Sequence, residues 1–214
     1  MKLDTAAGAV SAARDGPDDA RIAVVLGHGA GAGMDNDFMV AVARGLAERG
    51  AAAWRFNFAY VERGRRAPDR QDVLERTYAD VAEHVRAHEG AARLVLGGKS
   101  LGGRIASHVV ASGTRADGLL FLGYPLHPPG RPDRIRDAHL RGIEVPMLFV
   151  EGTRDPFCPL DTLERVRATL TAPTDVVVIE DGDHSFKVRK SSGRGTPEAW
   201  AEVVTAAATW LAAR

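Results

Sequence analysis

Short apolar runs alternate with longer amphipathic stretches along most of this chain. About six of these runs are typical of buried strands, and they lie at 22–26, 51–58, 94–97, 119–123, 147–151 and 176–180. The segments between them have helical spacing; in 70–88, for example, Leu74, Tyr78, Val81 and Val85 fall on one face. The other predicted helices lie at 37–49, 101–111, 160–170 and 197–213.

Strands that alternate with helices of about a dozen residues indicate βαβ units around a parallel sheet. The sequence therefore predicts a single three-layer α/β domain over residues 21–214, with a mostly parallel sheet of about six strands and no large cap. Residues 1–20 are small and polar, and we expect an N-terminal extension with at most one short strand. The charged segments 59–69 and 187–195 predict exposed loops.

Composition narrows the classes of partner. The chain has 214 residues with 28 basic and 28 acidic side chains, so its formal net charge of zero gives no electrostatic footprint for nucleic acid or an anionic membrane. No apolar stretch approaches the ~20 residues that cross a bilayer. The single cysteine, Cys158, suits a reducing compartment, and no apolar secretion signal follows Lys2. We expect a cytoplasmic monomer or homodimer whose partner is a small molecule.

Ser100 stands in the segment Gly98-Lys99-Ser100-Leu101-Gly102, between a predicted strand and a predicted helix. Glycines two residues before and after the serine permit a sharp strand-to-helix turn that leaves the hydroxyl exposed. A Walker A phosphate loop is excluded, because that motif needs glycine where Arg93 stands. The glycines of 27–33 fall at every second position, which does not match a dinucleotide-binding loop.

Two further strand ends carry the partners that a serine nucleophile needs. Asp155 follows the fifth predicted strand and His184 follows the sixth, and parallel strands bring their carboxyl ends to one edge of the sheet. We expect Ser100 to be the nucleophile, His184 the base and Asp155 the acid that orients the imidazole. Asp181 and Asp183 are alternatives for the acid, although they adjoin His184 rather than ending the preceding strand.

Four segments occur in the order found in α/β-hydrolases: His28-Gly29-Ala30-Gly31, Gly98–Gly103 around Ser100, Gly152–Pro156 around Asp155, and Gly182–Phe186 around His184. Together they resemble the α/β-hydrolase superfamily, and within it the small capless bacterial hydrolases similar to dienelactone hydrolases and to the testis-expressed protein-thirty group. Dienelactone hydrolases carry cysteine at the nucleophile position, whereas this chain carries Ser100. The resemblance therefore implies a serine esterase that needs no metal or organic cofactor.

An acyl-transfer site also needs oxyanion donors and a substrate pocket. The expected backbone donors are the N–H of Leu101 and that of Ala30 or Gly31. The residues expected around the pocket lie at strand ends or beside the motifs; they are His28, Phe58, Tyr60, Lys99, Tyr124, His127 and Phe157. His84 and His88 have the spacing of a helical metal pair, but an exposed helix face is the favoured interpretation.

The predicted function is hydrolysis of a small carboxylic ester or thioester through an acyl-enzyme. One alternative is a hydrolase-like binding or scaffold protein that has lost catalysis. Another is acyl transfer or peptidase action by the same three residues, because acceptor choice depends on pocket shape, which the sequence does not reveal.

Overall fold

The computed structural model describes all 214 residues, and its centre is one sheet of eight strands in the order β1-β2-β4-β3-β5-β6-β7-β8. The strands are β1 (Lys2–Leu3), β2 (Val10–Asp15), β3 (Ile22–Gly27), β4 (Ala52–Phe56), β5 (Arg93–Lys99), β6 (Gly118–Leu122), β7 (Met147–Gly152) and β8 (Thr174–Ile179). Strands β3 to β8 run parallel, as the sequence predicted.

Six α-helices and two 3₁₀ helices accompany the strands, and the last two of these helices follow β8. They are α1 (Asp37–Ala47), α2 (Ala59–Glu62), α3 (Gln71–Glu89), α4 (Leu101–Ala111), η1 (Ala138–Gly142), α5 (Leu160–Arg167), η2 (Lys190–Ser192) and α6 (Thr196–Ala212). None of them combines the length and apolar character that crossing a membrane needs. The prediction of an exposed loop over 59–69 is wrong at its start, because α2 begins there and Tyr60 is fully buried.

The N-terminal segment adds two strands to the sheet, not the single short one expected at most. Strand β2 pairs antiparallel with β4, with Ala12 opposite Phe56, and β1 pairs antiparallel with β2. The sheet therefore has eight strands where about six were predicted. Strand β2 alternates buried and partly exposed positions and its buried residues include small ones such as Ala12, so its hydrophobic pattern is weak.

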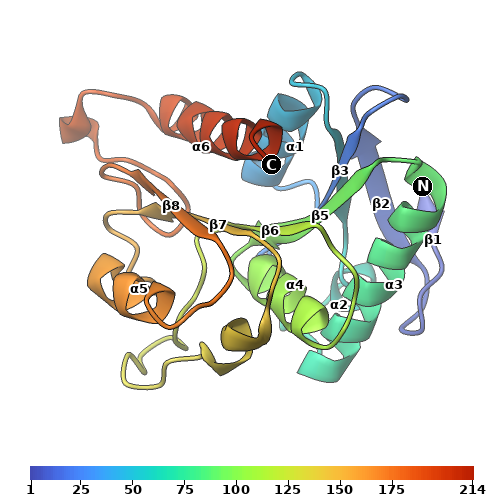
Figure 1. Cartoon of the computed structure of the whole chain (residues 1–214), viewed down its shortest axis with the longest axis horizontal. Coiled ribbons are helices and arrows are strands. Elements are labelled where there is room, and N and C mark those ends of the chain that lie inside the picture. Colours follow the sequence, from blue (N-terminus) through green and yellow to red (C-terminus); the bar gives the residue numbers. More distant parts are fainter.

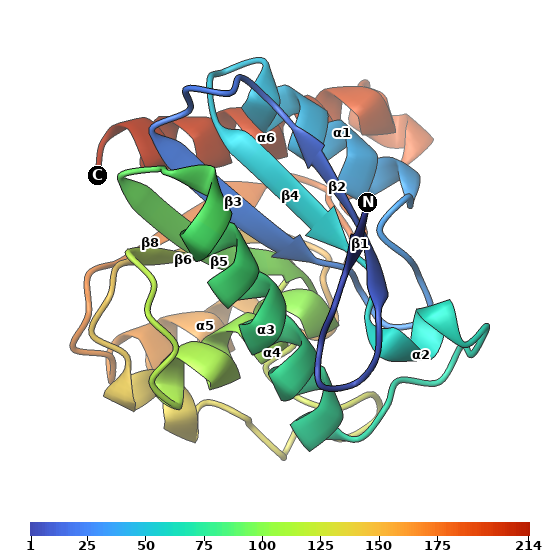
Figure 2. The same cartoon turned by 90° about the vertical axis from the view of Figure 1, so that its right-hand side faces the viewer.

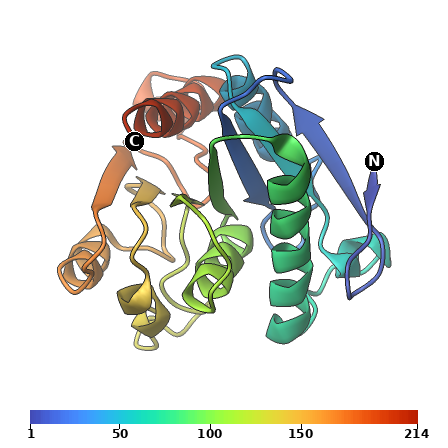
Figure 3. The same cartoon turned by 45° about the vertical axis from the view of Figure 1, so that its right-hand side comes forward.

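Helices cover both faces of the sheet. Helices α1 and α6 lie together on one face, and α3, α4 and α5 lie on the other (Figures 1 and 3). Residues of one strand alternate between the two cores: Val25 packs under α3 and α4, whereas Val24 and Leu26 pack under α1 and α6. The chain therefore forms three layers, and strands buried on both faces give the continuous apolar runs seen in the sequence.

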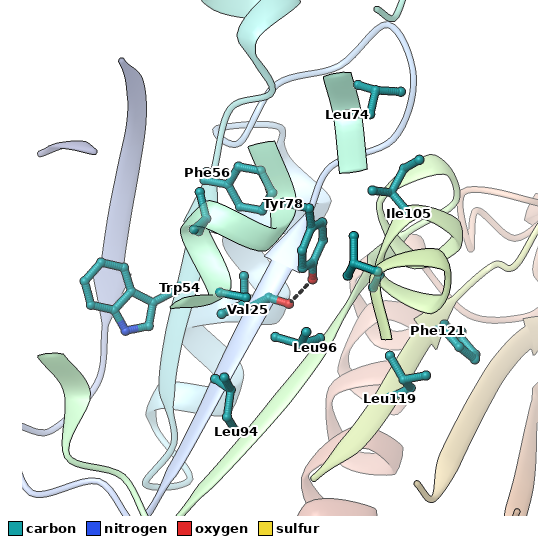
Figure 4. Packing of buried hydrophobic residues seen from close by; sticks show 14 of the residues in the cluster. Val25, Trp54, Phe56, Leu74, Tyr78, Leu94, Leu96, Ile105, Leu119 and Phe121 are labelled. Atoms are coloured by element: carbon teal, nitrogen blue, oxygen red, sulfur yellow. Dashed lines mark hydrogen bonds between the residues drawn. The ribbon is translucent and has the colours of Figure 1, made fainter. Parts of the chain in front are cut away.

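Tyr78 of α3 ties together the two strands that lead into the candidate site. Its hydroxyl lies 2.8 Å from the carbonyl oxygen of Val25 (Figure 4). The same hydroxyl lies 2.7 Å from the carbonyl oxygen of Gly97 and accepts a 2.8 Å hydrogen bond from the Gly97 N–H. Helix α3 runs alongside α4 in front of these strands (Figure 2). Tyr78 thereby fixes the spacing of β3 and β5, whose ends carry the glycine-rich loop and Ser100.

Candidate active site

Ser100 occupies a strained turn between β5 and α4. Its backbone angles, φ 50° and ψ −110°, are rare for a residue that has a Cβ. Its N–H donates to the carbonyl of Leu122 on β6 at 3.1 Å, which anchors the turn to the neighbouring strand. At Gly102, a Cβ would lie 2.0 Å from the carbonyl oxygen of Gly27, so the glycine lets α4 pack directly on β3. The turn holds the hydroxyl out of the sheet ladder, at the start of α4.

His184 lies on the loop that follows β8. Asp183 shapes this loop, because its Oδ1 accepts hydrogen bonds from the N–H groups of Ser185 at 2.7 Å and Lys187 at 2.9 Å. Phe186 adopts φ 56° and is fully buried, with its ring stacked on Phe38 of α1 at 5.3 Å. The tight turn and the buried ring together fix the position of the imidazole.

Hydrogen bonds join His184 to Ser100 on one side and to Asp155 on the other. The Ser100 hydroxyl lies 2.9 Å from Nε2, and Nδ1 lies 2.6 Å from Oδ2 of Asp155. A carboxylate only accepts hydrogen bonds, so Nδ1 carries the proton and Nε2 is free to accept from the serine. Residues 100, 155 and 184, far apart in sequence, thus form one continuous relay at the carboxyl edge of the sheet.

Asp155 is the acid that faces the imidazole. Its side chain has no exposed surface, and its Oδ1 accepts a 2.8 Å hydrogen bond from the N–H of Phe157. The two alternatives have other partners: Asp181 accepts from Nε of Arg189 at 2.6 Å, and Asp183 closes its own turn. The Phe157 ring meets the imidazole edge-on at 4.6 Å and shields this side of the relay.

A second buried carboxyl group lies beside Asp155. Glu151, near the end of β7, is fully buried; one oxygen accepts a 2.6 Å hydrogen bond from the Tyr124 N–H and the other has no partner. Burial and the negative charge of Asp155 raise the pKa of Glu151 well above its usual range. The raised pKa favours the protonated, neutral form of Glu151 in the folded protein.

Lys99 places a buried ammonium group next to these carboxyl groups. It is 8% exposed, and its Nζ has no hydrogen-bond partner. Burial lowers its pKa to about 8, although the negative charge of Asp155 opposes that change. Lys99 Nζ, the His184 carbonyl and Asp155 Oδ2 all lie within 3.5 Å of the point where a Cβ on Gly123 would stand. Gly123, at φ 67°, leaves the space that these groups share.

The loop of residues 28–34 brings backbone N–H groups beside the serine. His28 donates from Nδ1 to the Gly29 carbonyl at 2.8 Å and accepts at Nε2 from the Phe58 N–H at 3.2 Å, and burial lowers its pKa. The N–H groups of Ala30 and Gly31 donate no backbone hydrogen bond. Leu101 is the first residue of α4, where N–H groups have no partner within the helix.

A cleft of about 540 Å³ opens above the serine. Of the residues expected around it, Lys99, Ala30, Leu101, His127 and Phe157 line the cleft together with Ser100 and His184, and Gly31 does not. His28, Phe58, Tyr60 and Tyr124 were expected at its rim, but that expectation is wrong because none of them lines it and all four are fully buried.

The side chains of these four residues pack below the cleft. His28, Phe58 and Tyr60 pack edge-on or stacked with one another, and the Tyr124 hydroxyl bonds to Ser107 of α4. They support the loops that carry the site.

Sequence reasoning missed several residues of the cleft wall. Arg104 and Arg136 line it, as do Phe38 of α1 and Trp200 of α6. A signal existed for Arg104, because it stands four residues after Ser100 and thus on the same face of α4. No pattern marked Arg136 or Trp200, whose positions depend on how the connecting loop and α6 fold back over the sheet edge.

The order and geometry of these segments agree with a known family. A model of the alpha/beta hydrolase domain matches residues 20–212. This chain belongs to the α/β-hydrolase family. The match spans nearly the whole chain, and it confirms the family and the fold class that the motifs predicted.

Solved structures share this fold at low sequence identity. A serine hydrolase homologue from Coxiella burnetii superposes with a TM-score of 0.77 at 20% identity, over 96% of this chain and 95% of that one. A serine hydrolase without a lid from Xanthomonas campestris gives 0.74 at 22% identity, over 98% and 93%. A dienelactone hydrolase from Anabaena variabilis gives 0.77 at 17% identity, over 98% and 94%. Like the Xanthomonas protein, this α/β-hydrolase has no cap over its cleft.

Proposed function

We propose that this chain is a serine hydrolase that cleaves small carboxylic esters or thioesters through an acyl-enzyme. The observation that carries the proposal is the continuous relay from Ser100 through His184 to Asp155, with the serine held in a strained turn beside an open cleft. Membership of the α/β-hydrolase family supports the same reaction class.

Acylation begins when the Ser100 oxygen attacks the substrate carbonyl carbon. As that bond forms, the hydroxyl proton passes to Nε2 of His184, which lies 2.9 Å away. Asp155 stabilises the resulting imidazolium through Nδ1 and keeps the ring oriented. The imidazolium then gives its proton to the leaving oxygen or sulfur, the bond to that atom breaks, and the acyl group remains on Ser100.

Deacylation repeats the sequence with water as the nucleophile. His184 takes a proton from water, the oxygen adds to the acyl carbon, and the bond to Ser100 breaks as the serine recovers its proton. The N–H groups of Leu101 and Ala30 are the proposed donors to the oxyanion in both steps. Ala30 is favoured over Gly31 because Ala30 lines the cleft and Gly31 does not.

Steady-state kinetics with 4-nitrophenyl acetate and butyrate test this proposal. Ser100→Ala should lower kcat/KM by several orders of magnitude, because the nucleophile is lost while the binding site remains. Ser112→Ala is the matched control, since Ser112 is exposed at the far end of α4. Equal activity of Ser100→Ala and Ser112→Ala would contradict the proposal.

The same assay separates the alternatives. A folded wild-type protein that turns over no ester and reacts with no fluorophosphonate would instead be a binding or scaffold protein. Acyl transfer would appear as a rise in product formation when an added alcohol or amine competes with water for the acyl-enzyme. Peptidase action would require cleavage of matched amide substrates at a comparable kcat/KM.

A further inference from the structure

Positive charge is concentrated on the wall of the cleft. Lys99, Arg104, Arg136 and Lys187 line it, whereas Asp37 is the single acidic residue that does. The chain as a whole has a formal net charge of zero. The excess of positive charge is therefore local to the cleft, and two of its members, Arg104 and Arg136, come from different elements that face the same space.

Arg104 stands on α4 four residues after the nucleophile, about 6 Å along the helix axis at 1.5 Å per residue. Its Nη1 lies 3.2 Å from Nε2 of His108 and donates weakly to Oε1 of Gln71 at 3.5 Å. It forms no ion pair, because the neighbouring carboxylate of Glu75 faces Nδ1 of His108 at 3.7 Å. A guanidinium on a cleft wall is thus left without a negative partner.

Arg136 approaches from the loop that follows β6. Its backbone N–H donates to the carbonyl of Leu126 at 2.8 Å, which fixes its position at the cleft. The adjacent carboxylate of Asp137 pairs with Arg141 at 3.0 Å and does not neutralise Arg136. Burial lowers the pKa of Arg104, and the positive charge of Arg136 lowers it further, so the two guanidinium groups repel each other.

We infer that Arg104 and Arg136 form a subsite for an anionic group of the substrate, so that the preferred ester carries a free carboxylate. This inference rests on the proposed serine-hydrolase function and adds the substrate class. Guanidinium groups present planar pairs of donors that match the two oxygens of a carboxylate, and an anion between them would relieve their repulsion. Because Arg104 stands one helical turn from Ser100 and lines the same cleft, a short linker between the ester carbonyl and the anion fits this arrangement.

Matched pairs of substrates test the inference. The first pairs are the 4-nitrophenyl monoesters of succinic, glutaric and adipic acid and the neutral methyl esters of the same compounds. A further pair, 4-carboxyphenyl and 4-carbamoylphenyl acetate, places the charge on the leaving group. The readout is the ratio of kcat/KM for the anionic ester to that for its neutral partner, which cancels losses common to both substrates.

Three variants test which arginine sets the ratio of kcat/KM values. Arg104→Gln should lower that ratio roughly ten- to hundredfold for the best anionic substrate, as expected for loss of a hydrogen bond to a charged group. The Arg136 side chain is more exposed than that of Arg104, so Arg136→Gln should lower the ratio less, roughly two- to fivefold. Arg134→Gln, an exposed residue of the same loop that does not line the cleft, should leave the ratio unchanged. Added salt should reduce the wild-type ratio.

The outcomes separate the two proposals. An identical ratio in the wild type and all three variants, with neutral esters still hydrolysed, overturns the anionic subsite and leaves the hydrolase in place. Absence of turnover for every ester by folded wild-type protein overturns both. The Arg136 side chain is exposed and makes no hydrogen bond, so Arg136→Gln should fold normally. It therefore still tests the subsite if Arg104→Gln fails to fold.

Discussion

Replacing Glu151 with glutamine should stabilise the protein at high pH and not at low pH. The side chain is fully buried, one of its oxygens has no partner, and Asp155 lies close by, so the folded protein holds this carboxyl group in its neutral form. Glutamine has nearly the same shape and can still accept from the Tyr124 N–H, but it has no proton to release.

The magnitude follows from proton linkage. Below the ordinary glutamate pKa of 4.5, the group is protonated in both the folded and the unfolded chain, and the two proteins should have similar stability. As the pH rises, the unfolded wild type releases the proton while the folded protein keeps it, so the free energy of unfolding falls. The loss is about 1.4 kcal/mol per pH unit until the raised folded pKa is reached.

Urea denaturation of both proteins at pH 5, 6, 7 and 8 measures this difference. The advantage of Glu151→Gln should grow as the pH rises above 5, by at most about 1.4 kcal/mol per pH unit, and should level off once the pH passes the raised folded pKa. Glu144→Gln removes the same group from an exposed position and should show no such growth. Parallel stability curves for Glu151→Gln and the wild type would refute the buried, neutral state of Glu151.

Three further substitutions test how the site is held together. Asp155→Asn should lower kcat by about 10⁴-fold with little change in fold, because the amide favours the wrong imidazole tautomer; unchanged pre-steady-state acylation would contradict that role. Tyr78→Phe should cost about 1–3 kcal/mol in urea denaturation, because the Gly97 N–H loses its buried partner; an unaltered midpoint would show that the bridge between β3 and β5 is dispensable. Gly102→Ala should lower stability by at least about 1–3 kcal/mol and slow catalysis, since its Cβ would lie 2.0 Å from the Gly27 carbonyl oxygen; a variant with wild-type stability and rate would mean that α4 can move away from β3 freely.

The sequence predicted most of the parallel part of the fold because β3 to β7 are almost wholly buried on both faces. Such strands appear as uninterrupted apolar runs, and the helices between them keep a clear helical period. Strand β2 lacked that signal, because it lies near the sheet edge and carries small and polar residues from Val10 to Asp15. Its pairing with β4 is a tertiary interaction that local pattern does not encode.

The relay residues were accessible from sequence for a topological reason. Parallel strands bring their carboxyl ends to one edge, so Ser100, Asp155 and His184 could be placed together without coordinates. The cleft lining could not be placed in the same way, because the direction of a side chain beyond a strand end depends on its neighbours. Phe58 turns inward against His28 and Phe56, for example, and no local pattern distinguishes that from an exposed aromatic residue.

Glu151 illustrates a second limit. It ends an apolar run and was passed over as part of the strand, yet its burial beside Asp155 gives the site a second carboxyl group. Glu151, Asp155 and Lys99 come close together only because the sheet brings the ends of β5 and β7 to the same edge. Electrostatic arrangement around the relay is thus a property of the packed structure.

Covalent labelling is the most direct test of Ser100 as the nucleophile. Wild-type protein is treated with a fluorophosphonate, and the digested peptides are mapped by mass spectrometry. We expect one phosphonylated residue, Ser100, and slower labelling in His184→Ala because the base is lost. Folded protein that remains unlabelled, or that carries the label on another residue at wild-type rate in Ser100→Ala, would contradict this expectation.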